Sequence, residues 1–532
     1  MSDLWQSPAV LAIRADGDYR GRQMEQPDSP PRLLDVLIVG AGISGIGLAA
    51  HLRRECPSRS FAIVERRQAI GGTWDLFRYP GIRSDSDMYT LGYRFAPWRG
   101  DRTIAEGDTI RDYLDRVVGE HDLRRHIRFG QEVMAADWDG KAGRWTVTMC
   151  DAAGGEVRQQ ARFLFVGAGY YDHDSPHDAQ LPGLGEFKGT VVHPQFWPQD
   201  LDWSGQRVVV IGSGATAVTL VPALAERAGK VTMLQRTPSW YFNIPARDGL
   251  AGLLRRVLPE RWAYGLIRAK NVAMQAMFFR RARRTPGEVG EFLHRKLAED
   301  LGPDFDREAF TPPYGPWQQR MCFVPDGDLF AALKSGRAEL VTGSIARVEA
   351  DGIVLADGRR IAADVIVTAT GLRLAVLGKM ALSLEGQPVT LGEHYWYRNC
   401  MFSNLPNLAA VFGYLNAGWT LRVDIVADYL CRLLNQMTAW DMDVVTPHLP
   451  ADHGLVEDPV LDLFSSGYLQ RGKHLIPKSA TTAPWRIRMD YLGDRRELRD
   501  APIDDGALRF ERLRTAPSAI SARELVEPAA VS

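Results

Sequence analysis

Two glycine-rich segments have the residue spacing that holds the pyrophosphate of a dinucleotide. They are Gly40-Ala41-Gly42-Ile43-Ser44-Gly45 and Gly212-Ser213-Gly214-Ala215-Thr216-Ala217. In this motif the first glycine makes a tight turn, the second lets the backbone approach the phosphates, and the third position permits close packing of a helix on a strand. Alanine is tolerated at that third position. The helix that follows offers unpaired N–H groups and the positive end of its dipole, so each segment predicts a dinucleotide site.

The sequence around each segment predicts the strand–turn–helix–strand unit that makes such a motif specific. The alternative is that the glycines only make tight turns, but an isolated turn does not require these flanking elements. The elements expected around the two segments are, in chain order, the strand Leu34–Val39, the helix Ile46–Arg54, the strand Phe61–Glu65, the strand Arg207–Ile211, a helix to about Glu226 and the strand Val231–Gln235.

The last residues of the second strand in each unit distinguish the two dinucleotides. Glu65 ends the strand of the first unit, where an acid accepts the ribose hydroxyls and repels a 2′-phosphate. The first site therefore suits FAD or NAD⁺. Arg236 and Thr237 follow the strand of the second unit, and a planar guanidinium with a neighbouring hydroxyl suits the 2′-phosphate of NADPH. The alternative for Arg236 is a solvated surface charge.

Composition excludes several other classes of protein. The chain has 532 residues, enough for two or three domains, and a formal net charge of −1, which gives no general electrostatic attraction to nucleic acid. No two cysteines have metal-ligand or redox-pair spacing, which argues against a metal site and against a disulfide reductase. A reducing, cytoplasmic location is expected. The five cysteines are Cys56, Cys150, Cys322, Cys400 and Cys431.

Neither the apolar stretches nor the N-terminus predicts membrane insertion. Leu33–Leu52 and Val208–Ala225 approach the length of a membrane span, but each has a glycine-rich turn at its middle. Met1–Arg32 is polar and proline-containing, with no apolar region typical of a signal peptide, so a loosely ordered tail is expected there.

Two longer stretches carry a family resemblance. Gly71–Asp85 matches every fixed position of [A/G]GxWxxxx[F/Y]P[G/M]xxxD, and Phe187–Pro198 matches FxGxxxHxxx[W/F][P/D]. Both patterns resemble signatures of the Baeyer–Villiger monooxygenases, class B flavoprotein monooxygenases whose broader relatives oxygenate nitrogen and sulfur. The resemblance extends from about Leu34 to at least Trp419. It is strongest to the ethionamide-activating branch, in the run Trp74–Met88 and in the segment around Arg320.

The resemblance implies a reaction and two catalytic residues. In this family NADPH reduces FAD, and O₂ adds to give a C4a-peroxyflavin that attacks a ketone and yields an ester or lactone. The developing negative charge needs a fixed cation, and arginine cannot quench it by losing a proton. The family's catalytic arginine corresponds to Arg320, preceded by Gln319 where most relatives have lysine. Asp85 matches the acid that orients this arginine, with Asp87 as a rival, and an ordinary ion pair is the alternative role for Arg320.

Further site residues follow from the two motifs and the resemblance. Arg83 is expected near both cofactors, and His193 is expected to act as a hinge residue between domains rather than as a general base. No metal ligand is expected. The residues expected to contact FAD or NADP are Gly40, Gly42, Ser44, Gly45, Glu65, Gly72, Thr73, Trp74, Asp75, Arg83, Asp85, Val133, Gly212, Ser213, Gly214, Ala215, Thr216, Ala217, Arg236, Thr237, Thr370 and Gly371.

The expected fold is α/β, with two doubly wound Rossmann-like domains and the NADP domain inserted in the FAD domain. Residues 33–175 form the first part of the FAD domain, residues 176–361 the NADP domain, and residues 362–532 the second FAD part with a C-terminal extension. The strands Phe163–Val166 and Asp364–Thr368 are expected to lead back to the cofactors. A basic helical segment, residues 248–300, is expected to cover the substrate. Its outer face is a solvated surface, a substrate mouth or a peripheral membrane contact.

The leading function is therefore oxidation of a ketone to an ester or lactone, with sulfide oxygenation as a side activity. The expected partners are a small organic ketone or sulfide and O₂, without nucleic acid. One alternative is an N- or S-oxygenating flavin monooxygenase. Another is an NADPH-dependent flavin reductase or oxidase that oxygenates nothing.

Overall fold

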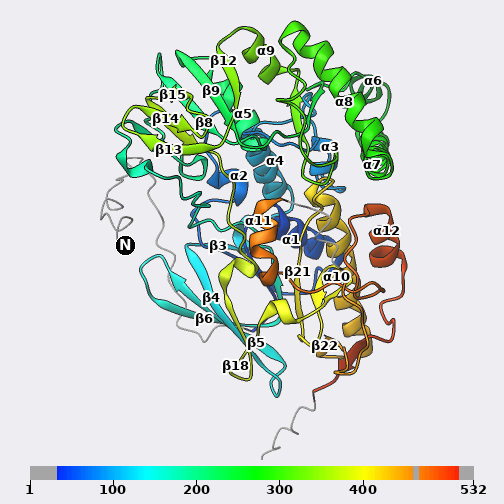
Figure 1. Ribbon diagram of the computed structural model, residues 1–532. Coiled ribbons are helices and arrows are strands. Elements are labelled where there is room, and N and C mark those ends of the chain that lie inside the picture. The colour runs from blue at the N-terminus through cyan, green and yellow to red at the C-terminus, as the bar shows by residue number, and fades with distance from the viewer. Residues whose placement is uncertain (1–32, 459–465, 514–532) are drawn as a thin grey trace, which may run out of the picture. The chain divides into compact units, whose positions relative to one another are not determined.

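Two β-sheets organise the part of the chain that the computed structural model describes, residues 33–458 and 466–513 (Figure 1). The expected N-terminal tail, residues 1–32, lies outside the described residues. None of the helices in the described ranges combines the length and the apolar composition needed to span a bilayer.

The first sheet is built around the first glycine motif. β1 (Leu34–Val39) lies between β2 (Phe61–Glu65) and the second half of β6 (Glu156–Val166), and all three are parallel. The strands are apolar because both faces are covered, as is usual for parallel sheets. The other strands of this sheet are β3 (Ile127–Phe129), β4 (Gln131–Asp139), β5 (Arg144–Asp151), β17 (Ala381–Leu384), β18 (Gln387–Pro388), β19 (Trp396–Tyr397), β20 (Met401–Phe402) and β21 (Leu408–Ala410).

Helices α1 (Ile43–Glu55), α4 (Gly107–Glu120) and α10 (Trp419–Trp440) contribute to one apolar core beside this sheet. α1 and α10 approach closely at Gly47, where a Cβ atom would lie 2.7 Å from Cγ1 of Val423. Because α10 comes from the last third of the chain, segments far apart in the sequence build this layer, as the blue ribbon of α1 and the yellow ribbon of α10 in Figure 1 show.

The second sheet is fully parallel, in the order β12 (Ala338–Thr342), β9 (Lys230–Gln235), β8 (Arg207–Ile211), β16 (Val365–Thr368) and β7 (Thr190–Val192). Helices α5 (Ala215–Leu224) and α9 (Asp328–Lys334) share an apolar core with it. A small antiparallel sheet packs on the strands of this second sheet, and together they form another apolar core. Its strands are β13 (Ile345–Glu349), β14 (Gly352–Leu355) and β15 (Arg360–Ala362).

The chain leaves the first sheet after β6, builds the second sheet from β7 to β16, and returns to the first sheet with β17. This order confirms the expected α/β class with one Rossmann-like unit inserted in another. The expected boundary between residues 361 and 362 is wrong, because β16 pairs with β7 and β8 in the second sheet. A short apolar strand is compatible with either sheet, and its sequence does not encode which strands it will join.

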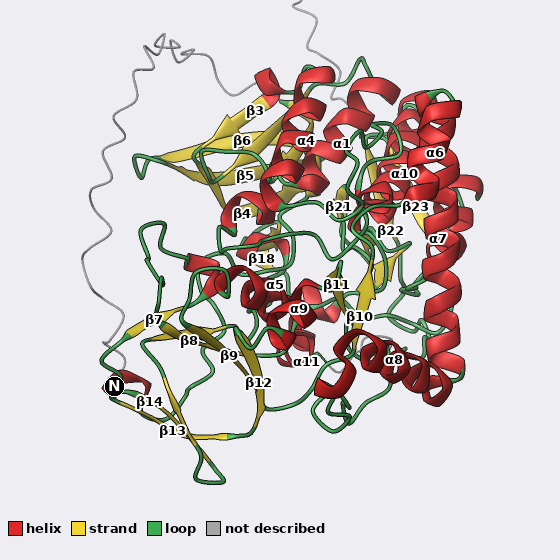
Figure 2. Ribbon diagram, turned by 90° about the horizontal axis from the view of Figure 1, so that it is seen from above, coloured by secondary structure: helices red, strands yellow, loops and turns green. Residues whose placement is uncertain are grey.

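Some helix limits also differ from the expectation. α1 begins at Ile43, inside the glycine motif, and α5 ends at Leu224 rather than near Glu226. The segment expected to be helical contains α6 (Gly249–Val257), α7 (Glu260–Arg284) and α8 (Pro286–Leu301). These helices lie at one edge of the described unit in both ribbon views (Figures 1 and 2).

The C-terminal region, which the sequence leaves difficult to interpret, packs against the first domain. Its elements include β22 (Val444–Pro447), α11 (Gly467–Gly472), α12 (Tyr491–Arg495) and β23 (Leu508–Glu511). Asp494 in α12 is fully buried and forms an ion pair with Arg422 of α10, with an N–O distance of 2.9 Å. Remaining short elements are α2 (Thr73–Leu76), α3 (Met88–Leu91), β10 (Tyr241–Ile244) and β11 (Cys322–Pro325).

Candidate active site

A cavity of about 310 Å³ opens at the carboxyl ends of β1 and β2, where parallel sheets of this kind bind ligands. It is bordered by the first glycine motif, by the end of β2 and by the loop before α3. The residues expected to contact cofactor that line this cavity are Gly40, Gly42, Ser44, Glu65, Gly72, Thr73, Trp74, Arg83, Asp85 and Val133, with Ala215 and Thr216 of the second motif.

The glycines of the first motif have the geometry that their predicted roles require. Gly40 has φ +97°, a left-handed conformation that favours glycine, and a Cβ atom on it would lie 2.9 Å from the carbonyl oxygen of Gly167. A Cβ atom on Gly45 would lie 1.9 Å from the carbonyl oxygen of Gly40. Gly45 therefore allows α1 to pack on the turn and does not itself line the cavity.

The donor and acceptor groups around this cavity fit a dinucleotide. α1 begins after Gly42 without a side-chain cap, so its first N–H groups remain available to an anion. Glu65 is buried, and its carboxylate accepts hydrogen bonds from the N–H groups of Ala41 at 2.8 Å and Arg67 at 2.9 Å. Burial raises the pKa of this carboxyl group. A carboxylate has further lone pairs for ribose hydroxyls.

A second cavity, of about 810 Å³, lies at the carboxyl ends of β8 and β9. Gly212 has φ +140°, and a Cβ atom on it would lie 2.4 Å from the carbonyl oxygen of Ala369. α5 also begins without a side-chain cap. Ala217 does not line the cavity but is buried in the core of this domain. The expected residues that line it are Gly212, Ser213, Gly214, Ala215, Thr216, Arg236, Thr237, Thr370 and Gly371.

An ion pair between Arg320 and Asp85 borders both cavities. A guanidinium nitrogen of Arg320 lies 2.7 Å from a carboxylate oxygen of Asp85, and the two side chains are 37% and 27% exposed. The structure therefore brings together two residues that are 235 positions apart in the sequence. A permanent positive charge lies where the two cavities meet, and it remains accessible to a bound molecule.

Asp87 is engaged elsewhere. Its carboxylate accepts the N–H of Thr90 at 3.1 Å as the cap of α3, and it also accepts hydrogen bonds from Asn271 at 2.8 Å and Gln275 at 2.6 Å, both on α7. Its partners therefore fasten α7 to the loop that carries Asp85. Of the two candidate acids, Asp85 and Asp87, it is Asp85 that binds Arg320.

Packing positions the two members of the pair from opposite sides. Trp317, three residues before Arg320, has φ +65° and a buried side chain that packs against Phe279 and Phe323. On the other side, Gly81 has φ +75°, and a Cβ atom on it would lie 2.8 Å from the carbonyl oxygen of Thr219 in α5. The loop of the first domain therefore lies directly against the first helix of the second glycine motif.

Cys322, two residues after Arg320, is not a nucleophile at this site. Its thiol is buried and lies 3.7 Å from the carbonyl oxygen of Ser213. Burial raises the pKa of the thiol to about 12, so it stays protonated at neutral pH.

Three other residues expected at the site are held by other groups or lie away from one or both cavities. Asp75 is not brought to either cavity, because Arg67 at 2.6 Å and Arg78 at 2.5 Å bind its carboxylate. Arg83 lines the first cavity and forms an ion pair with Asp328 of α9. His193 lines neither cavity. Its Nδ1 accepts the N–H of Gln195 at 3.2 Å, and burial lowers its pKa to about 4, while the backbone of Gly371 opposes that shift.

Comparison with known proteins places these observations in one family. A family described as "Flavin-binding monooxygenase-like" matches residues 102–279, and one described as "NAD(P)-binding Rossmann-like domain" matches residues 38–97. The chain is 45% identical to the FAD-containing monooxygenase EthA of Mycobacterium tuberculosis over 486 residues, 91% of this chain and 99% of EthA. The chain belongs to the flavin-binding monooxygenase family.

Solved structures of two other monooxygenases share this fold. A steroid monooxygenase bound to NADP superposes with a TM-score of 0.71 at 20% identity, covering 90% of this chain and 99% of its own. A cyclohexanone monooxygenase bound to ε-caprolactone superposes with a TM-score of 0.69 at 19% identity, covering 90% of this chain and all of its own.

Sequence reasoning missed two residues of this flavin-binding monooxygenase that line both cavities, Tyr171 and Leu372. A signal for each was present. Tyr171 follows the predicted strand that ends in Gly167-Ala168-Gly169, and Leu372 follows the Ala369-Thr370-Gly371 segment. Both segments end strands whose carboxyl ends point to the cavities, so the next residues along the chain are well placed to reach a ligand.

Proposed function

We propose that the protein is an FAD- and NADPH-dependent monooxygenase that inserts one oxygen atom of O₂ into a ketone and yields an ester or lactone, with sulfide oxygenation as a further activity. The observation that carries this proposal is the Arg320–Asp85 ion pair on the shared border of the two cavities. A flavin reductase or oxidase has no need for a fixed cation at that position.

FAD is assigned to the first cavity and NADPH to the second. Glu65 and the uncapped start of α1 suit the ribose and pyrophosphate of FAD, and EthA, a close relative, is named as FAD-containing. Arg236 and Thr237 suit a 2′-phosphate. Bound FAD, reduced by NADPH, supplies the oxygen-activating chemistry.

Within this proposal the protein contributes charge, orientation and a site for the substrate. Arg320 keeps its positive charge at any physiological pH and stabilises negative charge that develops on oxygen during transfer. Asp85 is a positioning residue that holds the guanidinium at the cavity wall. Trp317 and Gly81 hold the backbones of the two loops in place.

A smaller cavity of about 150 Å³ adjoins the first cavity, and both are lined by Ala417. We propose that it receives the body of the substrate. Within the described residues, Oε1 of Gln275 and Oδ1 of Asn416 have no hydrogen-bond partner, so they are available to a donor group on that substrate. The apolar part of its wall includes Val272, Ala276, Phe279, Leu421, Met489 and Leu492.

The domain assignment belongs to the same proposal. Residues 33–175 and the chain that follows β16 form the FAD domain, and residues 176–368 form the NADP domain. His193 follows β7, the edge strand of the second sheet, and its lowered pKa supports the proposed role of a neutral hinge residue rather than a proton carrier.

The second candidate function is N- or S-oxygenation as the main reaction. The match of residues 102–279 to the Flavin-binding monooxygenase-like family favours it. The two functions differ in their preferred substrates, because ketones require a nucleophilic oxygen donor whereas sulfides and amines require an electrophilic one.

The test is a comparison of turnover by the FAD-loaded protein with an aliphatic ketone, a sulfide and a tertiary amine. Ester formation that matches NADPH consumption supports the leading proposal. Oxygenation of the amine and sulfide without ester favours the second candidate. NADPH consumption with hydrogen peroxide as the only product refutes both.

A further inference from the structure

Exposed apolar side chains are concentrated on two adjacent helices, α6 and α7. Seven of the twelve large apolar side chains that are strongly exposed in the described residues lie there, although the two helices make up a small part of the chain. Trp262 is 71% exposed and Met277 is 66% exposed. A clustered apolar surface of this kind usually marks a binding surface. The seven residues are Leu250, Leu253, Val257, Trp262, Leu266, Met274 and Met277.

Seven of the exposed residues of α7 form one continuous stripe. Each lies three or four residues after the one before it, which keeps them on one side of an α-helix. From Trp262 to Met277 the stripe carries no charge over about 22 Å, and two arginines then continue it. The stripe consists of Trp262, Leu266, Ala269, Ala273, Met277, Arg280 and Arg284.

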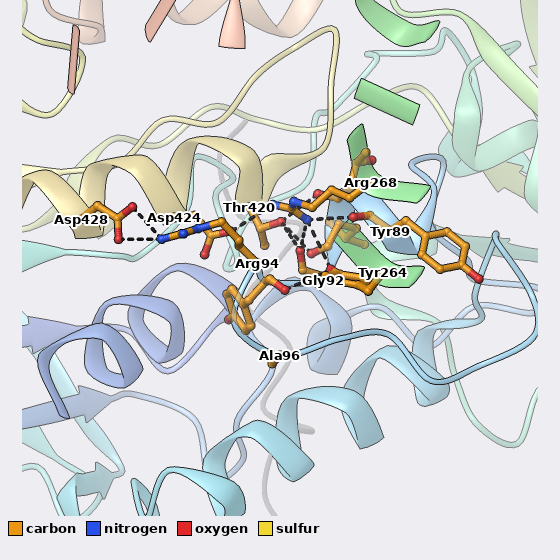
Figure 3. A network of polar contacts seen from close by, with 12 residues as sticks. Tyr89, Gly92, Arg94, Ala96, Tyr264, Arg268, Thr420, Asp424 and Asp428 are labelled. Atoms are coloured by element: carbon orange, nitrogen blue, oxygen red, sulfur yellow. Dashed lines mark hydrogen bonds and ion pairs between the residues drawn. The ribbon is translucent and has the colours of Figure 1, made fainter. Parts of the chain in front are cut away.

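The opposite side of α7 is fixed to the first domain by buried polar contacts (Figure 3). Arg268 donates hydrogen bonds to the carbonyl oxygens of Tyr89 at 2.8 Å and Gly92 at 2.5 Å, and forms an ion pair with Asp424 of α10 at 3.0 Å. The hydroxyl of Tyr264 donates to the carbonyl oxygen of Tyr93 at 3.0 Å. Because this side of the helix is fastened, the apolar stripe is held facing outward.

The same two helices carry a strong positive charge in a chain whose net charge is −1. Residues 249–284 contain nine basic residues and one acidic residue, Glu260, which already binds Arg99 at 2.9 Å. Four of the nine have acidic partners: Arg268 with Asp424, Lys270 with Asp248, Arg280 with Asp490 and Arg281 with Glu288. The other five basic residues are Arg255, Arg256, Arg261, Arg283 and Arg284.

We propose that the face of α6 and α7 docks on the surface of a lipid bilayer that contains anionic lipids. Tryptophan, leucine and methionine side chains enter the boundary between headgroups and acyl chains, while arginines beside them contact the lipid phosphates. Anionic headgroups supply the negative charge that this basic surface lacks, and the attraction acts within a Debye length of the bilayer. The docking is independent of the reaction proposed above.

A second copy of the chain fits this face less well. A symmetric dimer brings the same surface of two subunits together, so the basic ends of one copy would meet basic residues of the other. The face offers only Glu260 to compensate, and Arg99 already engages it. Self-association is therefore the competing outcome in the experiment below.

The experiment is sedimentation of the FAD-loaded full-length protein with vesicles of phosphatidylcholine, with or without about 30% phosphatidylglycerol, at low and high salt. The test variant combines Trp262→Gln, Leu266→Gln and Met277→Gln. The matched control combines Met134→Gln and Val456→Gln, which replace exposed apolar residues elsewhere on the molecule. A third variant combines Arg256→Gln and Arg284→Gln. Melting temperature and NADPH oxidation report whether each variant is folded.

We expect the native protein and the matched control to bind the anionic vesicles, and the apolar triple variant to bind them at least about tenfold more weakly. The arginine variant should lose binding to anionic vesicles, and added salt should weaken the native protein's binding. Equal binding by the native protein and the folded triple variant overturns the proposal, as does no binding by the native protein. A change of oligomeric mass in the triple variant, without a change in vesicle binding, assigns the face to self-association instead.

Discussion

Replacement of Arg320 tests the central charge of the proposed reaction. Arg320→Ala removes the cation from the border of the two cavities but leaves both glycine motifs and their helices intact. We expect NADPH to reduce the flavin at nearly the native rate, because hydride transfer does not require this charge. Formation of oxygenated product should fall steeply.

The size of the loss follows from the exposure of the side chain. Arg320 is 37% exposed, so the effective dielectric constant lies between that of a protein surface and that of water. For unit charges about 4 Å apart, that range corresponds to about 1–4 kcal/mol. Since 1.36 kcal/mol is a factor of ten, product formation should fall by about 5-fold to about 1,000-fold. The nearby Asp85 carboxylate partly offsets the charge, so the upper value is a limit.

The assay separates the two half-reactions. Anaerobic mixing with NADPH measures the loss of flavin absorbance, and a separate aerobic reaction measures ester by gas chromatography. Arg320→Lys is the matched control, because it keeps the charge and loses only the planar fork, so it should retain part of the activity. Normal ester formation by Arg320→Ala would refute the role of this charge. Equal loss of flavin reduction and ester formation would point instead to damage of the NADPH site.

The other predictions concern the cofactor sites and the pH dependence of stability. Arg236→Ala should raise KM for NADPH by about 10- to 100-fold and leave KM for NADH nearly unchanged, because only NADPH carries the 2′-phosphate. Equal changes in the two KM values would contradict the assignment of Arg236 to the 2′-phosphate. Gly45→Ala should abolish FAD binding and lower the melting temperature sharply, since the added Cβ atom would lie 1.9 Å from the carbonyl oxygen of Gly40. The control Gly214→Ala should fold normally, because a Cβ atom there meets no atom within 4 Å. Folding lowers the pKa of His193 to about 4, so the unfolded chain binds the extra proton, and stability should fall as pH drops from about 6.5 to about 4. Urea unfolding of His193→Asn should show a smaller fall over this range, and an unchanged pH dependence would contradict the buried neutral histidine.

Three strands next to the glycine motifs could be predicted from sequence to the residue. β1, β2 and β8 have the predicted bounds, because each is a short apolar run that ends at a glycine turn or at a charged residue. The start of α1 at Ile43 was not predicted, since helix composition does not reveal that the turn itself contributes the first helical residues. The sequence therefore predicted the presence and type of these elements better than it predicted the residues at which the helices begin and end.

Long-range pairing could not be predicted in the same way. The apolar strand β16 carries no information about whether it joins β8 or the strands of the first sheet. Asp75 lies in the recognised signature, but whether its carboxylate faces the cavity or the two arginines beside it depends on how the loop folds. The buried pair of Arg422 and Asp494 joins residues 72 positions apart, and neither residue has a local pattern that indicates the other.

The two acids of the signature illustrate how structure resolves an ambiguity that spacing leaves open. Asp85 and Asp87 point to the same side in an extended backbone, because alternate residues share a face. The hydroxyl of Ser84 donates to the carbonyl oxygen of Ser86 at 2.7 Å, which turns the loop between the two acids. Asp87 then caps α3 and binds α7, while Asp85 reaches Arg320. One acid thus fastens the helix whose outer stripe is proposed to meet the bilayer, and the other orients the cation of the proposed reaction. Replacement of Asp87 by asparagine should therefore loosen α7 without removing the ion pair at the cavities.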